Sequence, residues 1–164
     1  MPIAPAVTFF EAVLALHIMA VVVAFGVTFA FPVIFAVGAR LDPRSLPVLH
    51  RIECAVEQRI VNPGLIVIVI AGIYLASKLH AWKFFFVQWG LGVAIVIGGL
   101  VGAVMIPTAK RAAEIAERDV NSAGEQIVMS DEYRALTRRL ASVGALLSML
   151  VLVTIFFMVT QTGA

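Results

Sequence analysis

Four apolar stretches, joined by connectors that hold most of the charged residues, divide this chain. They cover residues 12–39, 60–76, 84–106 and 140–159, and each is close to or longer than the roughly 20 residues with which an α-helix crosses a bilayer. Backbone groups in lipid must find hydrogen-bond partners within their own segment, so each stretch is predicted to be a helix. The pattern therefore predicts an all-α fold, an integral membrane four-helix bundle in which residues 1–164 form a single transmembrane domain.

The connector before the second stretch has a helical period of its own. From Ser45 to Ile60 the apolar residues recur every three or four positions, which predicts an amphipathic helix that runs on into the second span. Asn62 and Pro63 follow, and we expect them to interrupt this helix near the membrane surface.

The connector before the fourth stretch also contains helical signals. Residues 109–120 predict an extension of the third span, and residues 121–124 predict a break. Ser130, followed by two acidic residues, is the expected N-cap of a helix that continues into the fourth span. Helical extensions should therefore lengthen the bundle on its cytoplasmic side.

In the first stretch, Pro32 removes a backbone donor and is the expected position of a bend.

Basic residues are distributed unevenly between the two sides of the predicted bundle. The connectors over residues 40–59 and 107–139 hold four and six Lys or Arg residues, whereas the opposite side holds only Lys78 and Lys83. Cytoplasmic loops carry such an excess, so the two long connectors are expected in the cytoplasm and both termini on the outer side. The net charge is only +2, and no basic cluster indicates a nucleic-acid partner.

Composition supports a membrane protein with the lipid bilayer as its surroundings. Hydrophobic residues make up 62% of the chain and charged residues 13%, which is outside the usual range of a soluble domain. The first ten residues contain no Lys or Arg, so we expect the first stretch to be a retained span and not a signal peptide. Cys54 is the only cysteine, which excludes an intramolecular disulfide.

Small residues form a stripe along the third span. They are Gly90, Ala94, Gly98 and Gly102, spaced four residues apart on one helix face. Such residues let a neighbouring backbone approach closely in lipid. We expect this stripe to form the tightest seam of the bundle, and the same pattern also fits a homo-oligomer through these four residues.

His17 is the one imidazole within an apolar stretch, and a polar group there is usually either paired or functional. The proposed topology places it level with the polar residues between the second and third spans, among them Lys83 and Gln88. The ring could simply bond a facing carbonyl or Gln88, or it could be a ligand of iron, copper or zinc. The other two histidines, His50 and His80, are expected to be exposed or interfacial, and Tyr74, Trp82 and Trp89 to be interface anchors.

Counting ligands narrows the choice of metal. The spans contain no HxxxH or CxxC pattern, which argues against structural zinc, and the methionines are too scattered for a copper site. Haem requires only one or two axial ligands and a slot between apolar helices, so a single His17 is compatible with it.

Several segments resemble one known family. The run Leu16-His17-Ile18, with Phe25-Gly26 and Phe31-Pro32 after it, is similar to the first helix of the small bacterial HemJ-type protoporphyrinogen oxidases and their CopD-like relatives. The segment that begins at Trp82 and continues with Lys83 and three phenylalanines resembles the entry to that family's third helix. The resemblance implies that His17 binds haem b, that Lys83 is a functional basic residue and that the protein lies in a bacterial inner membrane. Related four-helix families of unknown function share the Leu-His pattern.

Two functions are left open by the sequence. One is a haem-associated redox role on a lipophilic substrate such as a porphyrinogen or a quinol, in which His17 holds the iron and Lys83 attracts an acidic group. The other is a non-enzymatic membrane scaffold, or a transport-associated subunit, with no cofactor. Whether the protein is an enzyme is not decided by the residues.

Overall fold

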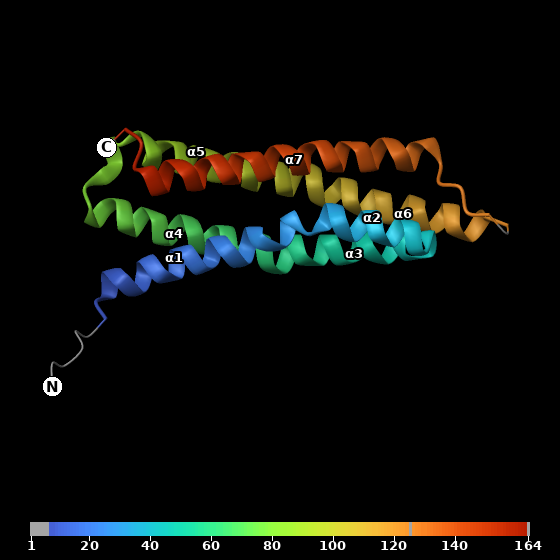
Figure 1. The fold of residues 1–164 in the computed structure, drawn as a ribbon, viewed down its shortest axis with the longest axis horizontal. Coiled ribbons are helices and arrows are strands. Elements are labelled where there is room, and N and C mark those ends of the chain that lie inside the picture. Colours follow the sequence, from blue (N-terminus) through green and yellow to red (C-terminus); the bar gives the residue numbers. More distant parts are fainter. Residues whose placement is uncertain (1–6, 125, 164) are drawn as a thin grey trace.

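Four long helical segments run side by side in the computed structural model, which describes residues 7–124 and 126–163 (Figure 1). The segments are Phe9–Leu41, Pro43–Lys78, Phe85–Ser122 and Asp131–Thr160, and each is long and apolar enough to cross a membrane. The described residues contain no β-strand. The predicted all-α class and the four apolar helices are therefore confirmed.

Each of the first three segments changes helical geometry along its length. The first consists of α1 (Phe9–Gly26), a 3₁₀ turn (Val27–Phe29) and α2 (Phe31–Leu41). The second consists of a 3₁₀ turn (Pro43–Ser45), α3 (Leu46–Val56), a π-helical turn (Glu57–Val61) and α4 (Asn62–Lys78). After a 3₁₀ turn (Ala81–Lys83), the third consists of α5 (Phe85–Leu100), a π-helical turn (Val101–Met105) and α6 (Ile106–Ser122). The fourth is the single helix α7 (Asp131–Thr160).

Side-chain caps fix the starts of α1 and α7. Thr8 and Glu11 form a reciprocal capping box, in which each side chain accepts a hydrogen bond from the other residue's backbone N–H. The hydroxyl of Ser130 accepts a hydrogen bond from the N–H of Tyr133 at 3.3 Å, which confirms the predicted N-cap. α6 ends at Ser122, within the predicted break.

The prediction for Asn62 and Pro63 is wrong, because the second segment continues through them without a break. The π-helical turn ends at Val61, and Pro63 occupies the second position of α4. A proline is tolerated in the first turn of a helix, where its missing N–H costs little. Pro32 likewise stands at the second position of α2, shortly after the 3₁₀ turn of the first segment, and the bend expected there stays a prediction.

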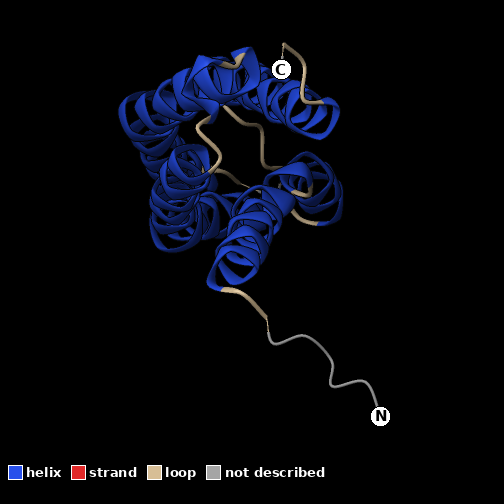
Figure 2. Ribbon diagram, turned by 90° about the vertical axis from the view of Figure 1, so that its left-hand side faces the viewer, coloured by secondary structure: helices blue, strands red, loops and turns tan. Residues whose placement is uncertain are grey.

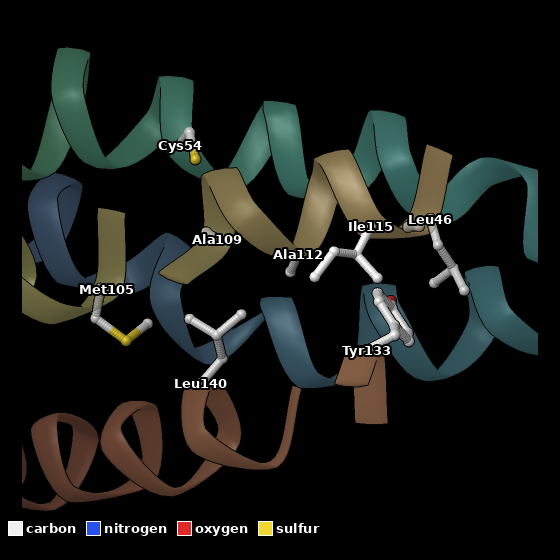
Figure 3. Close-up of a cluster of buried hydrophobic side chains, with 9 residues drawn as sticks. Leu46, Cys54, Met105, Ala109, Ala112, Ile115, Tyr133 and Leu140 are labelled. Carbon is white, nitrogen blue, oxygen red and sulfur yellow. The ribbon is translucent and has the colours of Figure 1, made fainter. Parts of the chain in front are cut away.

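The four segments pack in pairs, with α1 along α4 and α3 along α6, while α7 lies against α5 and α6. Figure 2 shows the bundle of helices from one end. One apolar core lies between α1, α4, α5 and α7 and includes Ala24, Leu65, Ile97 and Val151. A second core lies between α3, α6 and the first half of α7, and includes Leu46, Ile115, Tyr133 and Leu140 (Figure 3). α1 begins and α7 ends at the same end of the bundle (Figure 1).

The small-residue stripe is not the tightest seam along its whole length, so that prediction is wrong in part. A Cβ atom on Gly90 would clash with Met158, and one on Gly98 would lie 3.2 Å from Leu65, but one on Gly102 would meet nothing within 4 Å. The closest approach of two helices that relies on a rigid neighbour is at Gly64 on α4, where a Cβ would lie 2.7 Å from the Cβ of Ala24 on α1. Association of two copies through the stripe stays a prediction.

Candidate functional site

His17 is half-buried on the face of α1 that packs against α4. Its Nδ1 lies 3.0 Å from the carbonyl oxygen of Ile68, and Gly72 leaves room for the ring, since a Cβ there would lie 3.3 Å from its Cε1 atom. A carbonyl oxygen only accepts hydrogen bonds, so Nδ1 donates and carries the ring proton. Nε2 therefore keeps its lone pair in the neutral ring. The expectation that a facing carbonyl could bond His17 is confirmed.

A cavity of about 310 Å³, here called the His17 cavity, adjoins this ring. Its walls are apolar side chains of α1, α4, α5 and α7, and Gly90, Thr154 and Met158 lie among the residues that line it. The indole N–H of Trp89 donates to the hydroxyl of Thr154 at 3.1 Å, which joins α5 to α7 inside the bundle. Trp89 thus makes an interhelical contact, and its expected role as an interface anchor stays a prediction.

Lys83 and Gln88 are not brought to the His17 cavity. Lys83 ends the 3₁₀ turn before α5, and its Nζ lies 5.5 Å from the centre of the Phe84 ring. The side-chain amide of Gln88 donates to the carbonyl of Trp82 at 3.1 Å. His17 is therefore the one residue of the expected polar layer that lines this cavity, and the described residues contain no group of three His, Cys, Asp or Glu side chains that could hold a metal ion.

A second polar cluster, which the sequence reasoning missed, lies between α3 and α7. His50 is only 2% exposed, so the expectation of an exposed or interfacial His50 is wrong. Its Nδ1 lies 3.0 Å from the Glu53 carboxylate and its Nε2 lies 3.0 Å from the Tyr133 hydroxyl. Buried polar groups require such partners. The signal was present in the sequence, because spacings of three and four residues place His50, Glu53 and Glu57 on one face of a helix.

Glu57 extends this cluster by one helical turn, and its surroundings differ from those of Glu53. It is 4% exposed and begins the π-helical turn of the second segment. Its Oε2 is buried and has no hydrogen-bond partner among the residues that the structure describes. π-Helical turns are rare and occur frequently at functional sites. Glu57 is therefore a candidate ligand-binding residue, because a ligand could supply the hydrogen bond that its buried carboxyl oxygen lacks.

His50, Glu53 and Glu57 line one end of a larger cavity of about 700 Å³, here called the central cavity. Its other residues come from every long segment, and include Thr28, Phe35, Met105, Tyr133, Arg138 and Gly144. The 3₁₀ turn of the first segment and both π-helical turns contribute to its wall through Thr28, Glu57 and Val101. The three helical irregularities of the bundle's interior therefore meet around one cavity.

The central cavity and the His17 cavity are neighbours. Phe25, Ile97 and Val151 line both of them, so one layer of apolar side chains lies between the two spaces. The two cavities also differ in character, because the His17 cavity has one polar ring in an apolar wall, whereas the central cavity has a polar end and an apolar end.

No protein-family model, curated protein or solved structure matches this chain significantly, so the site is interpreted from its own chemistry.

Proposed function

We propose that this protein is a multi-pass protein of the cell membrane that takes a lipophilic molecule from the bilayer into the central cavity. The observation that carries the proposal is the cavity itself, whose volume of about 700 Å³ falls within the range of small-molecule sites, roughly 300–1,000 Å³. Like most such sites, it combines apolar walls with a few polar groups at one place.

The cavity's level in the bundle supports this proposal. A hydrocarbon layer of roughly 30 Å spans about 20 helical residues at ~1.5 Å per residue. Counted from the end where α1 begins, this distance reaches Thr28, Glu57 and Met105 on the first three segments. With the termini on the outer side, the polar end of the cavity lies at the inner membrane boundary and the apolar end lies within the hydrocarbon layer. An amphiphilic molecule has the same division.

α2 begins just on the cytoplasmic side of the inner membrane boundary and forms one wall of the cavity. α2 packs against α3 and α7 packs against α5 and α6, so that α2 and α7 face each other as walls of the cavity. The outer face of α2 stays apolar, with Val33, Val37 and Leu41 exposed. A lipophilic molecule at the inner membrane boundary therefore meets an apolar surface beside the cavity.

A neutral long-chain alcohol that carries a photoreactive diazirine tests the proposal. The protein is purified in a neutral maltoside detergent, irradiated with the probe and analysed by mass spectrometry. We expect labelling of cavity residues such as Ala36 and Ser148 that excess unlabelled alcohol abolishes, together with non-competable labelling of outward residues such as Leu146. Labelling confined to outward residues would contradict the proposal.

A haem-associated redox role is a second candidate, and the tautomer of His17 favours it. Metal-bound histidines usually donate their other ring N–H to a carbonyl or carboxylate, as Nδ1 does to Ile68. Nε2 of His17 would hold the iron, and the apolar walls of the His17 cavity would exclude water. When bound, haem supplies one-electron transfer. A porphyrinogen or quinol in the central cavity would be one side-chain layer away, and Lys83 at the outer end would attract acidic groups.

A scaffold or transport-associated role without a cofactor is the alternative that the same hydrogen bond supports. The Ile68 carbonyl satisfies the ring proton of His17 without a metal. The His17 cavity, at about 310 Å³, is also at the small end of the range for small-molecule sites. Absorption spectroscopy of the unaltered protein and of His17→Ala separates the two candidates.

A further inference from the structure

We propose that the polar end of the central cavity is a receptor for an organic cation, so that the preferred ligand is a lipophilic amine. This inference rests on the proposed function, because it names the class of molecule that the central cavity takes. It is carried by three observations: the unpartnered carboxyl of Glu57, the charged groups of the cavity wall and the aromatic rings that line the same cavity.

The Glu57 carboxyl lacks a partner that a ligand could supply. Its Oε2 accepts no hydrogen bond from the described residues although it is fully buried. An unsatisfied buried polar group destabilises a protein, so native structures contain few of them. A protonated amine brings both the positive charge and the N–H donors that a buried carboxylate requires.

Glu57 has no counter-ion among the described charged residues that line the cavity. On its own segment, Glu53 is already bonded to His50 at 3.0 Å. The π-helical turn of the third segment contributes the apolar Val101 and Met105 to the cavity, and the first segment contributes the hydroxyl of Thr28. α7 contributes Tyr133, Thr137 and Arg138.

Arg138 is the one cationic side chain among these cavity-lining residues, and it lies at the rim. Its side chain is exposed and forms no ion pair with any acid in the described part of the chain. Because the Arg138 guanidinium is exposed to water at the rim, it does not pair with the Glu57 carboxyl in the interior. The interior therefore offers a buried carboxyl oxygen to an N–H donor, while the rim would slow the entry of cations and favour anions.

Aromatic rings add a second means of holding a cation. The Phe35 ring lies tilted against the imidazole of His50, with ring centres 4.5 Å apart, and the Tyr133 ring packs edge-on against the same imidazole at 5.7 Å. Both rings line the central cavity. Carboxylates and aromatic faces together are the groups that recognise ammonium ions, and the apolar end of the cavity holds the ligand's hydrocarbon body.

A matched pair of probes tests this inference. A diazirine-bearing alkyl amine and the alcohol of the same chain length differ only in the head group, and both are applied at pH 7 to protein in neutral maltoside detergent. We expect competable labelling of the central cavity at about tenfold lower concentration for the amine, because hydrogen bonds to charged groups are the stronger ones.

Glu57→Gln is expected to lower the affinity for the amine to that for the alcohol and to leave the alcohol's own labelling unchanged. The control is Glu114→Gln, the same change on an exposed residue of α6, which should keep the tenfold preference. A thermal melt and the elution volume of each variant establish that it is folded. If Glu57→Gln does not fold, the preference of the unaltered protein for the amine over the alcohol still tests whether the cavity binds a cation.

The outcomes separate this inference from the proposed function. Equal labelling by amine and alcohol, unaffected by Glu57→Gln, would overturn the cation receptor and leave a cavity for neutral lipophiles. Stronger labelling by a carboxylic acid of the same length, lost in Arg138→Gln, would also overturn it. No competable labelling of the cavity by either probe would overturn the proposed function as well.

Discussion

The imidazole of His50 on α3 and the hydroxyl of Tyr133 on α7 are joined by a hydrogen bond of 3.0 Å, although 83 positions separate them in the chain. Tyr133→Phe removes the hydroxyl and leaves Nε2 of His50 buried without a partner. Such a loss typically costs about 1–3 kcal/mol, so we expect a measurable fall in the stability of the folded protein.

Denaturant-induced unfolding in detergent, followed by circular dichroism, measures this effect. Tyr74→Phe is the matched control, because the Tyr74 ring packs edge-on against Phe9 and its hydroxyl makes no hydrogen bond with the described residues. Equal stabilities of the two variants would mean that the bond between His50 and Tyr133 contributes nothing.

Gly64 should be the glycine at which a methyl group is least tolerated in the α1–α4 seam. Gly64→Ala places a Cβ 2.7 Å from that of Ala24, and the helices must separate to accommodate it. We expect a loss of about 1–3 kcal/mol, which is typical of overpacking. Gly92→Ala adds the same methyl group where nothing lies within 4 Å, and should change the midpoint of thermal unfolding little. A larger loss for Gly92→Ala than for Gly64→Ala would place the seam elsewhere.

Asp119 should make the connection between α6 and α7 sensitive to acid. Burial alone would raise the pKa of this carboxyl, but hydrogen bonds from Ser130 and Arg118 outweigh burial and hold the pKa below its ordinary value of 3.8. A lowered pKa in the folded state stabilises the protein above the unfolded-state pKa, and this contribution is lost as the pH falls through the folded-state value.

The unfolding midpoints of the unaltered protein and of Asp119→Asn, measured from pH 7 down to pH 3, test this dependence. The unaltered protein should be the more stable at pH 7, and the difference should shrink below about pH 4 as Asp119 becomes protonated. A difference that stays constant over this range would show that the charge of Asp119 is not involved.

The haem candidate predicts a spectrum that depends on one histidine. Protein expressed with ample haem supply should give haem bands in a reduced-minus-oxidised absorption spectrum, and His17→Ala should abolish them. His80→Ala, which changes an exposed histidine, should retain them. Colourless protein from all three preparations would remove the cofactor and leave the scaffold or transport role. In that case His17→Ala should cost only about 1 kcal/mol, the contribution of one interhelical hydrogen bond.

The order and type of the helical segments could be predicted from the sequence, because in lipid the backbone must satisfy its hydrogen bonds within each segment. The four helices, the helical extension from Ser45, the N-cap Ser130 and the end of α6 near Ser122 all follow from hydropathy and local hydrogen bonding. Pro63 does not interrupt the helix as predicted, because a proline does so only where its missing donor is needed, and Pro63 lies in the first turn of α4.

The candidate site was predicted only in part. The carbonyl partner of His17 could be anticipated, since a helix face opposite a buried imidazole offers few other acceptors. The spacing of His50, Glu53 and Glu57 indicates that they share a helix face, but not that this face is buried, because its burial depends on Tyr133, which α7 brings from a distant part of the chain. The unpartnered Oε2 of Glu57 likewise depends on which segments meet around the central cavity.

The central claim, that a lipophilic molecule occupies the central cavity, is tested most directly by filling that cavity. Gly144 lines it, and a Cβ there would meet nothing within 4 Å, so Gly144→Phe introduces a ring into open space without a clash at the backbone. Native mass spectrometry in the presence of a neutral long-chain alcohol should find one bound alcohol on the unaltered protein and on Gly92→Phe, and none on folded Gly144→Phe. Equal occupancy of all three proteins would contradict the claim.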